Sequence, residues 1–292
     1  MPLLLKAGPV AESVYARVTK AAQFCRDKSG HMPTLATILV GEDPGSQIYV
    51  RKKGEMCTKL GLGHKDHKFG SDVTESKLLE TVRALNADPK VDGILVQSPL
   101  PKHINSALVY DLIDPSKDVD CFSAHNVGLL VQGRGKLLPC TPAGVMEILR
   151  HHKIEPSGKS ALVVGRSDIV GKPMSFLLLH AHATVTMAHS KTRDLADRIA
   201  KADIVVAAIG KAKVLGGDLP WNKDAVVIDV GINRTAEGKV VGDVDFDTVS
   251  PKVAAITPVP GGVGPMTIAM LMVNTVRAAL ARQGLAEKEA GL

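Results

Sequence analysis

Short apolar runs alternate with helix-length amphipathic stretches along most of this 292-residue chain. Continuous apolar runs bounded by Gly or Pro are typical of strands buried on both faces, as in parallel sheets that are covered by helices. The predicted strands are residues 34–41, 91–97, 160–165, 184–188, 203–210, 225–231 and 254–259. The predicted helices cover about residues 46–60, 74–87, 173–182 and 192–202. This alternation predicts an α/β protein with parallel sheets.

The chain is long enough for two hydrophobic cores, and one segment rich in Gly and Pro marks the expected boundary. That segment, GRGKLLPCTP, covers residues 133–142 and follows the first two predicted strands. We therefore expect two α/β domains with a ligand-binding cleft between them.

Composition narrows the classes of ligand. Lys and Arg number 36 against 30 Asp and Glu, a net charge of +6 that no block of like charge concentrates. Aromatic residues make up 3% of the chain, whereas proteins that bind single-stranded nucleic acid stack its bases on aromatic side chains. We expect no nucleic-acid partner, and the diffuse positive charge suits an anionic small molecule.

The sequence also gives no sign of a membrane, a disulfide framework or a metal. No segment approaches the roughly 18 consecutive apolar residues of a membrane span, and the N-terminus lacks the long apolar region of a signal peptide. Four cysteines lie far apart, at Cys25, Cys57, Cys121 and Cys140. The histidines have no acidic partner to complete a metal site. A reducing, cytoplasmic location, with no metal and no membrane partner, is the expectation.

The segment VVGRSDIVGKPMS, residues 163–175, has the order strand, glycine turn and helix start. Gly165 allows a sharp turn, Gly171 allows close backbone approach, and Pro173 suits the first turn of a helix. The free N–H groups of that helix would face a phosphate. The glycine spacing fits neither the Walker loop nor G-x-G-x-x-G. A plain strand-to-helix turn is therefore the alternative to a dinucleotide site.

The end of the following strand indicates which dinucleotide would bind. NAD sites usually carry an Asp or Glu there for the ribose 2′-hydroxyl. Here Ser190, Lys191 and Arg193 come first, and the first acid is Asp194. Hydroxyl and cationic groups favour a 2′-phosphate, hence NADP, and Arg166 is a further candidate for that phosphate. A solvated basic helix start is the alternative, although cations there oppose the helix dipole unless an anion is bound.

The predicted helix at 46–60 has one lysine on an otherwise largely apolar face. With Ser46 as the expected N-cap, that face holds Tyr49, Lys53, Met56, Cys57 and Leu60. A lysine on such a face often lays its stem along apolar surface and keeps its ammonium in water. In a closed site, by contrast, burial would lower the pKa of Lys53 and make its amine a proton carrier near neutral pH.

Three further features fall at predicted loops. Gln97 ends a strand, where ligands of open α/β sheets bind, although a side chain satisfied by the next loop is an alternative. Asp118 and Asp120 lie on one side if their segment is extended, and a carboxylate there can accept two N–H bonds from a guanidine-like edge. A solvated turn is the alternative for that pair. The glycine-rich loop PVPGGVGPMT, residues 258–267, suggests backbone packed against a ligand.

Together these segments resemble the bifunctional methylenetetrahydrofolate dehydrogenase/cyclohydrolase family. YVRKK fits the Y-x-x-x-K element of that family with Tyr49 and Lys53. The other matching motifs, in the family's order, are DGILVQSPLP, KDVDCF, GRSDIVGKPMS, VIDVGIN and TPVPGGVGPMT. The resemblance covers about residues 34–275. The chain departs from the family at Ser98, where a larger apolar residue is frequent, at Cys121, where Gly is frequent, and in its opening KAGPVAE.

The resemblance implies a homodimer of two-domain subunits with parallel sheets and the active-site cleft between the domains. Residues 1–140 plus 266–292 would form the catalytic, folate-binding domain, and residues 141–265 a Rossmann-like, NADP-binding domain. The implied NADP-binding residues are Gly165, Arg166, Ser167, Ser190, Lys191 and Ile232.

The resemblance also implies roles for residues of the folate site. Tyr49 would pack beside the aromatic ring of the folate, and Lys53 would serve the chemistry. Gln97 would hydrogen-bond and tune the lysine, and Asp120 would bind the pterin edge. Gly262 and Pro265 would line the folate side.

The implied activity is oxidation of 5,10-methylenetetrahydrofolate to 5,10-methenyltetrahydrofolate with NADP⁺, followed by hydrolysis to 10-formyltetrahydrofolate. Tetrahydrofolate derivatives of one-carbon metabolism, which serve purine biosynthesis, would be its partners. Two alternatives stay open. A different NADP-linked dehydrogenase would explain the glycine turn but not Tyr49, Lys53 and the polar loop residues together. A non-catalytic NADP-binding regulator would need only the second domain.

Overall fold

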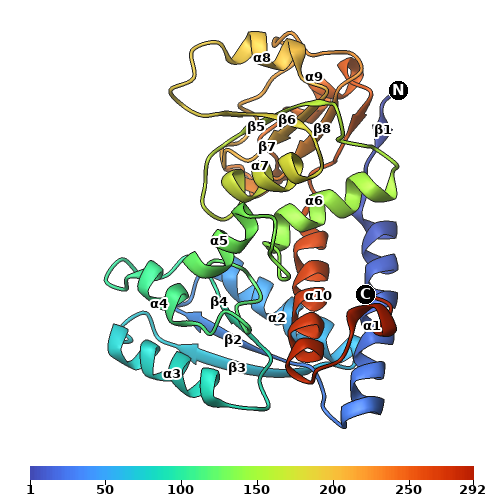
Figure 1. Cartoon of the computed structure of the whole chain (residues 1–292). Coiled ribbons are helices and arrows are strands. Elements are labelled where there is room, and N and C mark those ends of the chain that lie inside the picture. Colours follow the sequence, from blue (N-terminus) through green and yellow to red (C-terminus); the bar gives the residue numbers. More distant parts are fainter. The chain divides into compact units, whose positions relative to one another are not determined.

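The computed structural model describes residues 1–292, and the chain divides into two compact units (Figure 1). The three-strand unit comprises Ser13–Cys140 and Ile268–Leu292, and the six-strand unit comprises Met1–Glu12 and Thr141–Thr267. Each unit is built on a sheet of parallel strands flanked by helices. The predicted α/β class with two parallel-sheet domains is confirmed, whereas the predicted cleft between the domains stays a prediction.

The sheet of the three-strand unit has the order β3-β2-β4, and its strands are parallel. They are β2 (Thr34–Val40), β3 (Gly63–Phe69) and β4 (Gly93–Val96). Every residue of β2 is buried, as its apolar run predicts for a central strand. The sequence pattern does not predict β3, because its residues GHKDHKF are mostly polar and it forms an edge of the sheet.

The helices of this unit are α2 (Pro44–Leu60), α3 (Glu75–Ala87), α4 (Ser106–Leu112), α5 (Ala124–Val131) and α11 (Glu287–Ala290), with parts of α1 (Ala7–Ser29) and α10 (Gly264–Arg282). The expected N-cap Ser46 is wrong. The N-cap of α2 is Asp43, whose side chain accepts a hydrogen bond from the Ser46 N–H, and Pro44 occupies the first turn. α2 ends at Leu60 because Gly61 takes the left-handed conformation, with φ +74°.

The sheet of the six-strand unit has the order β1-β11-β8-β7-β5-β6, with every pair parallel. Its strands are β1 (Leu3–Leu4), β5 (Ser160–Val164), β6 (Thr184–Ala188), β7 (Ile204–Ala207), β8 (Val226–Asp229) and β11 (Ala255–Ile256). All except β1 lie within predicted strands. β1 pairs with β11, which places the first twelve residues in this unit, whereas the sequence assigns residues 1–140 to the other domain. An edge strand of two residues carries no pattern that predicts its partner.

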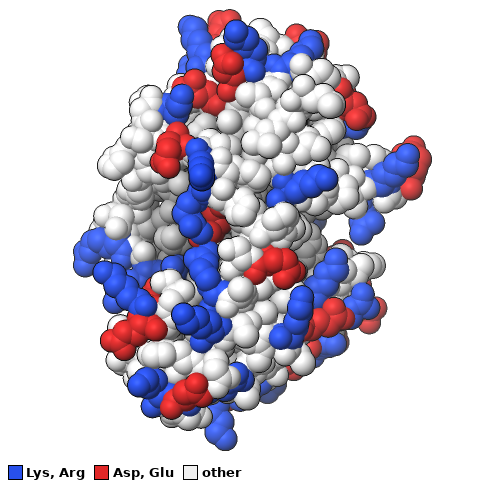
Figure 2. All heavy atoms as spheres, turned by 90° about the vertical axis from the view of Figure 1, so that its right-hand side faces the viewer, with Lys and Arg blue, Asp and Glu red and all other residues white.

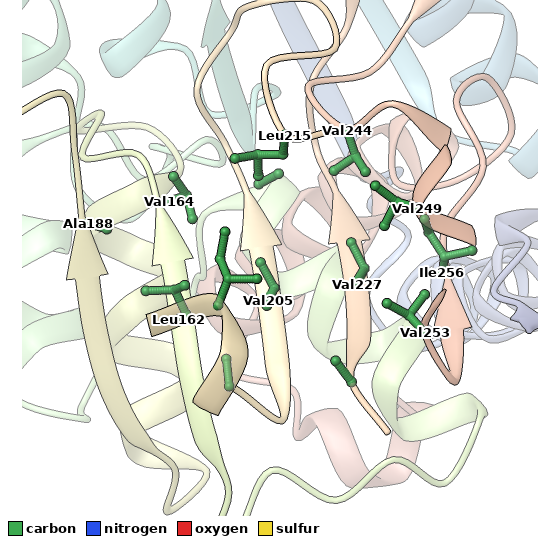
Figure 3. Packing of buried hydrophobic residues seen from close by; sticks show 14 residues of the cluster. Leu162, Val164, Ala188, Val205, Leu215, Val227, Val244, Val249, Val253 and Ile256 are labelled. Atoms are coloured by element: carbon green, nitrogen blue, oxygen red, sulfur yellow. The ribbon is translucent and has the colours of Figure 1, made fainter. Parts of the chain in front are cut away.

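The remaining elements are α6 (Cys140–His151), α7 (Gly171–His180), α8 (Leu195–Lys201), α9 (Phe246–Val249), the 3₁₀ helix η1 (Ser250–Lys252), β9 (Asn233–Arg234) and β10 (Val240–Val241). A hydrophobic cluster covers one face of the six-stranded sheet (Figure 3). In it Leu162, Val205 and Val227 lie side by side on neighbouring strands. Burial of such a side chain contributes about 1.5–3 kcal/mol. This core fixes the register, so the carboxyl ends of β5 to β8 meet at one edge of the sheet.

One helix, α10, is long and apolar enough to cross a membrane by length and composition alone. Within the most apolar 18-residue window of α10, 72% is buried inside the protein. Such burial is typical of a helix in the core of a protein. On the face shown in Figure 2, Lys and Arg are interspersed with Asp and Glu, so the net charge of +6 is not concentrated there.

Candidate active site

Lys53 lies in the middle of α2 with its side chain turned into the three-strand unit. The residues of α2 that are buried are Ser46, Val50, Lys53, Cys57 and Leu60, at the spacing of one helical face. Lys53 is only 6% exposed, whereas its neighbour Lys52 is exposed. The Nζ atom of Lys53 donates to Oε1 of Gln97 at 2.9 Å. The amine is therefore held inside the protein and does not extend into water.

Gln97 follows the last residue of β4, and its main-chain nitrogen, its Nε2 and its Oε1 all form hydrogen bonds. Its main-chain N–H donates to the carbonyl of Ile38 on β2 at 2.8 Å. Its side-chain Nε2 donates to the carbonyl of Ser98 at 2.7 Å. Because the amide nitrogen is used by Ser98, the amide oxygen faces Lys53. The end of the strand thus positions a hydrogen-bond acceptor for the buried amine.

The pKa of the Lys53 amine is lowered by its surroundings. Burial lowers the pKa of Lys53, and the negative charge of Asp120 opposes this shift in part. Burial also raises the pKa of Asp120, while the positive charge of Lys53 lowers it. Burial thus pushes each group towards its neutral form and their mutual attraction favours the charged pair. The pKa values of the two groups are therefore shifted towards each other.

The two carboxylates of the KDVD segment have different surroundings. Asp118 is buried and accepts bonds from the N–H groups of Phe122 and Ser123, the Ser123 hydroxyl and the Asn126 amide, at 2.6–3.2 Å. These bonds hold the start of α5. Asp120 is half-buried. Only Asp120 is therefore available to a ligand.

The segment that carries Asp120 is fixed from α10 and from the start of α6. The amide nitrogen of Asn274 donates to the carbonyls of Val119 at 2.8 Å and Leu138 at 2.7 Å. The thiol of Cys140 donates to the same Val119 carbonyl at 3.3 Å. Asn274 and Cys140 are buried. They hold the backbone on one side of Asp120, and Cys121 on the other side takes a left-handed conformation, with φ 59°.

Two tyrosines lie near these groups. Tyr49, on α2, is half-buried and one helical turn before Lys53. Tyr110, on α4, packs edge to face against Phe122 with ring centroids 5.4 Å apart. Burial raises the pKa of Tyr110, a hydrogen bond with Ser98 lowers it, and the charge of Asp120 raises it. The sequence analysis proposes Tyr49 but not Tyr110, because no motif marks the latter.

A second buried lysine in this unit has a different environment. Lys117 is fully buried, and its Nζ donates to the main-chain carbonyls of Leu85, Asn86 and Asp88 at 2.7–3.0 Å. It thus satisfies the carbonyls at the end of α3. All of its donors are used by the backbone, so Lys117 supports the fold, whereas Lys53 faces side chains that can take part in chemistry.

The predicted nucleotide-binding residues come together at one edge of the six-stranded sheet. Gly165 follows β5, Ser190 and Lys191 follow β6, and Ile232 follows β8. The register pairs Val164 with both Ala188 and Ala207, so these strand ends are level. Ile232 is 50% exposed at this edge.

The glycine turn fits a dinucleotide because its backbone is closely packed. A Cβ atom on Gly165, whose φ is +132°, would lie 2.0 Å from the Ala208 carbonyl oxygen, and one on Gly171 would lie 2.3 Å from the Gly165 oxygen. The hydroxyl of Ser167 accepts bonds from the N–H groups of Val170 and Gly171 at 3.2 Å, at the start of α7.

The cationic side chains at this edge are free to bind an anion. Arg166 and Lys191 are exposed and form no ion pair, whereas Lys172 pairs with Asp168. The expected free N–H groups at the start of α7 are not found, because those of Val170 and Gly171 donate to the Ser167 hydroxyl and that of Lys172 donates to the Ser167 carbonyl. The two free cations fit a phosphate-bearing cofactor.

A buried carboxylate that the sequence analysis misses holds the loop after β7. Asp243 is fully buried and accepts bonds from the consecutive N–H groups of Ile209, Gly210 and Lys211 at 2.5–3.0 Å. Asp229 accepts three further main-chain bonds, and burial raises its pKa to about 6. These two residues rigidify the same sheet edge. Apolar periodicity does not reveal them, because Asp229 is the last residue of β8 and Asp243 lies in the turn after β10.

The predicted folate-side residues Gly262 and Pro265 belong to the six-strand unit, at the start of α10. A Cβ on Gly262 would lie 2.4 Å from the Pro258 carbonyl oxygen, so the glycine is required by close backbone packing. The groups around Lys53 belong to the three-strand unit. That these groups bind the same folate substrate as Gly262 and Pro265 stays a prediction.

Residues 5–120 match the family described as "Tetrahydrofolate dehydrogenase/cyclohydrolase, catalytic domain", and residues 139–283 match its "NAD(P)-binding domain". The bifunctional protein FolD of Campylobacter concisus is 54% identical over 274 residues, which are 94% of this chain and 94% of that protein. The chain belongs to the tetrahydrofolate dehydrogenase/cyclohydrolase family.

Solved structures of the family agree with this membership. The bifunctional FolD methylenetetrahydrofolate dehydrogenase/cyclohydrolase of Campylobacter jejuni has a TM-score of 0.94 at 44% identity, covering 97% of this chain and all of that one. FolD of Trypanosoma brucei, solved with NADP cofactor and an inhibitor, has a TM-score of 0.91 at 36% identity, covering 98% of this chain and 99% of that one.

As a member of the tetrahydrofolate dehydrogenase/cyclohydrolase family, this chain is a bifunctional enzyme of one-carbon metabolism with an NAD(P)-binding domain. The resemblance seen in the sequence is confirmed, and membership disfavours both the unrelated dehydrogenase and the non-catalytic regulator. The roles of individual residues are developed next as proposals.

Proposed function

We propose that Lys53 moves the protons of the cyclohydrolase step and that Gln97 positions its amine. The observation that carries this proposal is the 2.9 Å contact between a buried amine and an amide oxygen at a strand end. In that step water adds to the methenyl carbon, and the bond from this carbon to N5 then breaks to give 10-formyltetrahydrofolate. The neutral amine takes one proton from the attacking water, and its ammonium returns that proton to N5 as the bond from the carbon to N5 breaks. The remaining hydroxyl proton of the adduct is released to solvent as the formyl carbonyl forms.

Gln97 contributes orientation and charge control. Its oxygen accepts one hydrogen of the Lys53 amine, which leaves the nitrogen lone pair directed away from the amide. The fixed main-chain and side-chain bonds of Gln97 hold this geometry before substrate arrives. Preorganisation of this kind lowers the barrier without reorganisation during the reaction.

In the dehydrogenase step the protein supplies position and a water-poor site. Bound NADP⁺ provides the hydride acceptor, and the N5 lone pair of the substrate stabilises the developing cation. We propose Gly165, Arg166, Ser167, Ser190, Lys191 and Ile232 as the NADP-binding residues. Free cations and a hydroxyl, instead of an acid, follow β6, which favours the 2′-phosphate of NADP over NAD. The NADP complex of the Trypanosoma brucei relative supports the same choice.

Asp120 is proposed to bind the pterin. Its carboxylate is half-buried and needs N–H donors to remain charged, because burial raises its pKa. The aminopyrimidinone edge of a tetrahydrofolate offers two such donors side by side. Tyr49 is proposed to pack against the aromatic ring of the substrate, with Gly262 and Pro265 on the folate side.

We also propose that residues 1–140 plus 266–292 serve folate binding and catalysis, that the enzyme is a homodimer, and that it is cytoplasmic. Its four cysteines are free thiols, all buried, which suits a reducing compartment. The unpaired edge of β3 supports association, because such an edge can accept a second chain. Sedimentation at micromolar concentration tests the dimer.

An absorbance assay of methenyltetrahydrofolate tests the proposed function. With 5,10-methylenetetrahydrofolate, we expect methenyl formation only when a nicotinamide cofactor is present, and faster with NADP⁺ than with NAD⁺. With methenyltetrahydrofolate alone, we expect enzyme-dependent loss of absorbance. An enzyme that fails in both assays, or that prefers NAD⁺, would contradict the proposal.

A further inference from the structure

The buried side chain of Asp243 is used entirely within the six-strand unit. Its Oδ2 accepts hydrogen bonds from the main-chain N–H groups of Ile209 at 2.5 Å and Gly210 at 3.0 Å. Its Oδ1 accepts bonds from the N–H of Lys211 at 3.0 Å and the side-chain amide of Asn233 at 2.9 Å. A carboxylate has about four acceptor sites, so all of them are occupied by the protein. Asp243 therefore acts on a ligand only through the residues that it holds.

These four bonds link the loops that follow two neighbouring strands. Residues 209–211 lie in the loop after β7, and Asn233 follows the loop after β8. The two strands are parallel and end at the same level, because Ala207 pairs with Asp229. Both loops therefore leave the carboxyl edge of the sheet side by side, and the Asp243 side chain holds one against the other.

Ile232 lies between two residues that contact Asp243. On one side, the Asn233 amide donates to Oδ1 of Asp243. On the other side, a Cβ atom on Gly231 would lie 2.2 Å from the same oxygen, so the backbone there packs directly against the carboxylate. Ile232 itself is 50% exposed. The backbone on both sides of this exposed apolar side chain is thus fixed before a ligand arrives.

The other loop supports the glycine turn after β5. A Cβ atom on Gly165 would lie 2.0 Å from the carbonyl oxygen of Ala208, which directly precedes Ile209. The turn therefore packs against the segment whose N–H groups Asp243 binds. One buried side chain thus supports two separate parts of the proposed NADP site, Gly165 and Ile232.

We propose that Asp243 is a positioning residue of the NADP site, which holds Ile232 and the support of the glycine turn in the geometry that binds the cofactor. This inference rests on the proposed function, because it takes Gly165 and Ile232 as NADP-binding residues. A residue whose backbone becomes ordered only on binding lowers the affinity by about five- to thirtyfold. Asp243 avoids this loss, because the loops that it holds are ordered in the free protein.

Asp243→Asn tests the inference, because it keeps the size of the side chain and replaces one acceptor oxygen by an NH₂ group that faces N–H donors. We expect the KM for NADP⁺ to rise about five- to thirtyfold, with kcat at saturating NADP⁺ within about threefold. Cyclohydrolase activity on methenyltetrahydrofolate, measured without NADP⁺, should stay within about twofold of wild type. A loss of stability alone would not produce this split between KM and kcat.

Asp203→Asn is the matched control. The Asp203 carboxylate accepts the N–H of Ser160 at 2.9 Å, at the amino ends of the strands of the same sheet. This substitution also removes a bond between a carboxylate and the backbone, but at the edge opposite to the proposed NADP site. We expect it to leave the KM for NADP⁺ unchanged.

Asn233→Ala provides a second variant, which removes one of the four bonds and keeps the carboxylate. We expect a smaller rise in the KM for NADP⁺, again with cyclohydrolase activity preserved. An unchanged KM for NADP⁺ in folded Asp243→Asn, or an equal loss of cyclohydrolase activity, would overturn the inference. If Asp243→Asn does not fold, an unchanged KM in Asn233→Ala would overturn it instead. If the wild-type enzyme forms no methenyltetrahydrofolate with NADP⁺, the proposed function itself fails, which is a distinguishable result.

Discussion

Replacement of Lys53 by Met separates the chemistry of this site from its contribution to folding. Met has nearly the length of the lysine stem and fills the same space on α2 without an amine. The substitution removes the 2.9 Å bond to Gln97, which is worth about 1 kcal/mol. It also removes the cost of burying an amine that is 6% exposed. These effects oppose each other, so we expect the free energy of unfolding to change by no more than about 1 kcal/mol.

The effect of Lys53→Met on the cyclohydrolase should be far larger. Loss of a positioned proton carrier typically lowers a rate by about 10²–10⁴, equivalent to about 3–5 kcal/mol of barrier. The absorbance decay of methenyltetrahydrofolate measures this step directly, and fluorescence titration with NADP⁺ verifies that the cofactor site is intact. Lys52→Met is the matched control, because Lys52 is exposed on the same helical turn. Retention of cyclohydrolase activity within tenfold of wild type, in a folded variant, would refute the proton-transfer role.

Three further predictions concern other buried charges. Asp120→Asn should raise the KM for folate substrates about 10–100-fold, because a charge-assisted hydrogen bond to the pterin is lost. The affinity for NADP⁺ should stay unchanged. An unchanged KM would argue against pterin binding by Asp120. The folded-state pKa of Asp229, about 6, lies above its usual value of 3.8, so its contribution to stability is present below pH 4 and is lost as pH rises through 6, by about 3 kcal/mol. Urea unfolding across that range should show this loss in wild type but not in Asp229→Asn, and parallel profiles would contradict it. Lys117→Met should lower the free energy of unfolding by about 3 kcal/mol or more, since three carbonyls lose their donor. Below the urea concentration at which the variant unfolds, kcat should be preserved. Wild-type stability in urea would show that the three bonds contribute little.

The functional side chains Lys53 and Gln97 can be predicted from the sequence, but the contacts that position them cannot. Lys53 stands out because a lysine interrupts an apolar helical face, and Gln97 because it ends an apolar strand. Their contact across 44 positions of sequence follows only from the sheet, which places the end of β4 beside α2.

Where the structure differs from the sequence prediction, the cause is physical. The N-cap of α2 is displaced from Ser46 to Asp43 because Pro44 begins the helix earlier than the apolar face does. Strand β3 is missed because an edge strand with polar residues lacks the apolar run of a central strand. The two carboxylates Asp118 and Asp120 look equivalent in sequence, yet four local donors bind the first and leave the second for a ligand. Local hydrogen bonding of this kind depends on backbone geometry that spacing alone does not determine.

The most direct measurement of the catalytic proposal is the titration of the Lys53 amine itself, by nitrogen NMR of the enzyme labelled at lysine Nζ, with Lys53→Met used to assign the resonance. Burial should give this amine a pKa clearly below that of an ordinary lysine, and Asp120→Asn should lower the pKa further, because the neighbouring negative charge is lost. An amine at position 53 that titrates at the ordinary lysine value, with no response to Asp120→Asn, would contradict the proposed proton carrier.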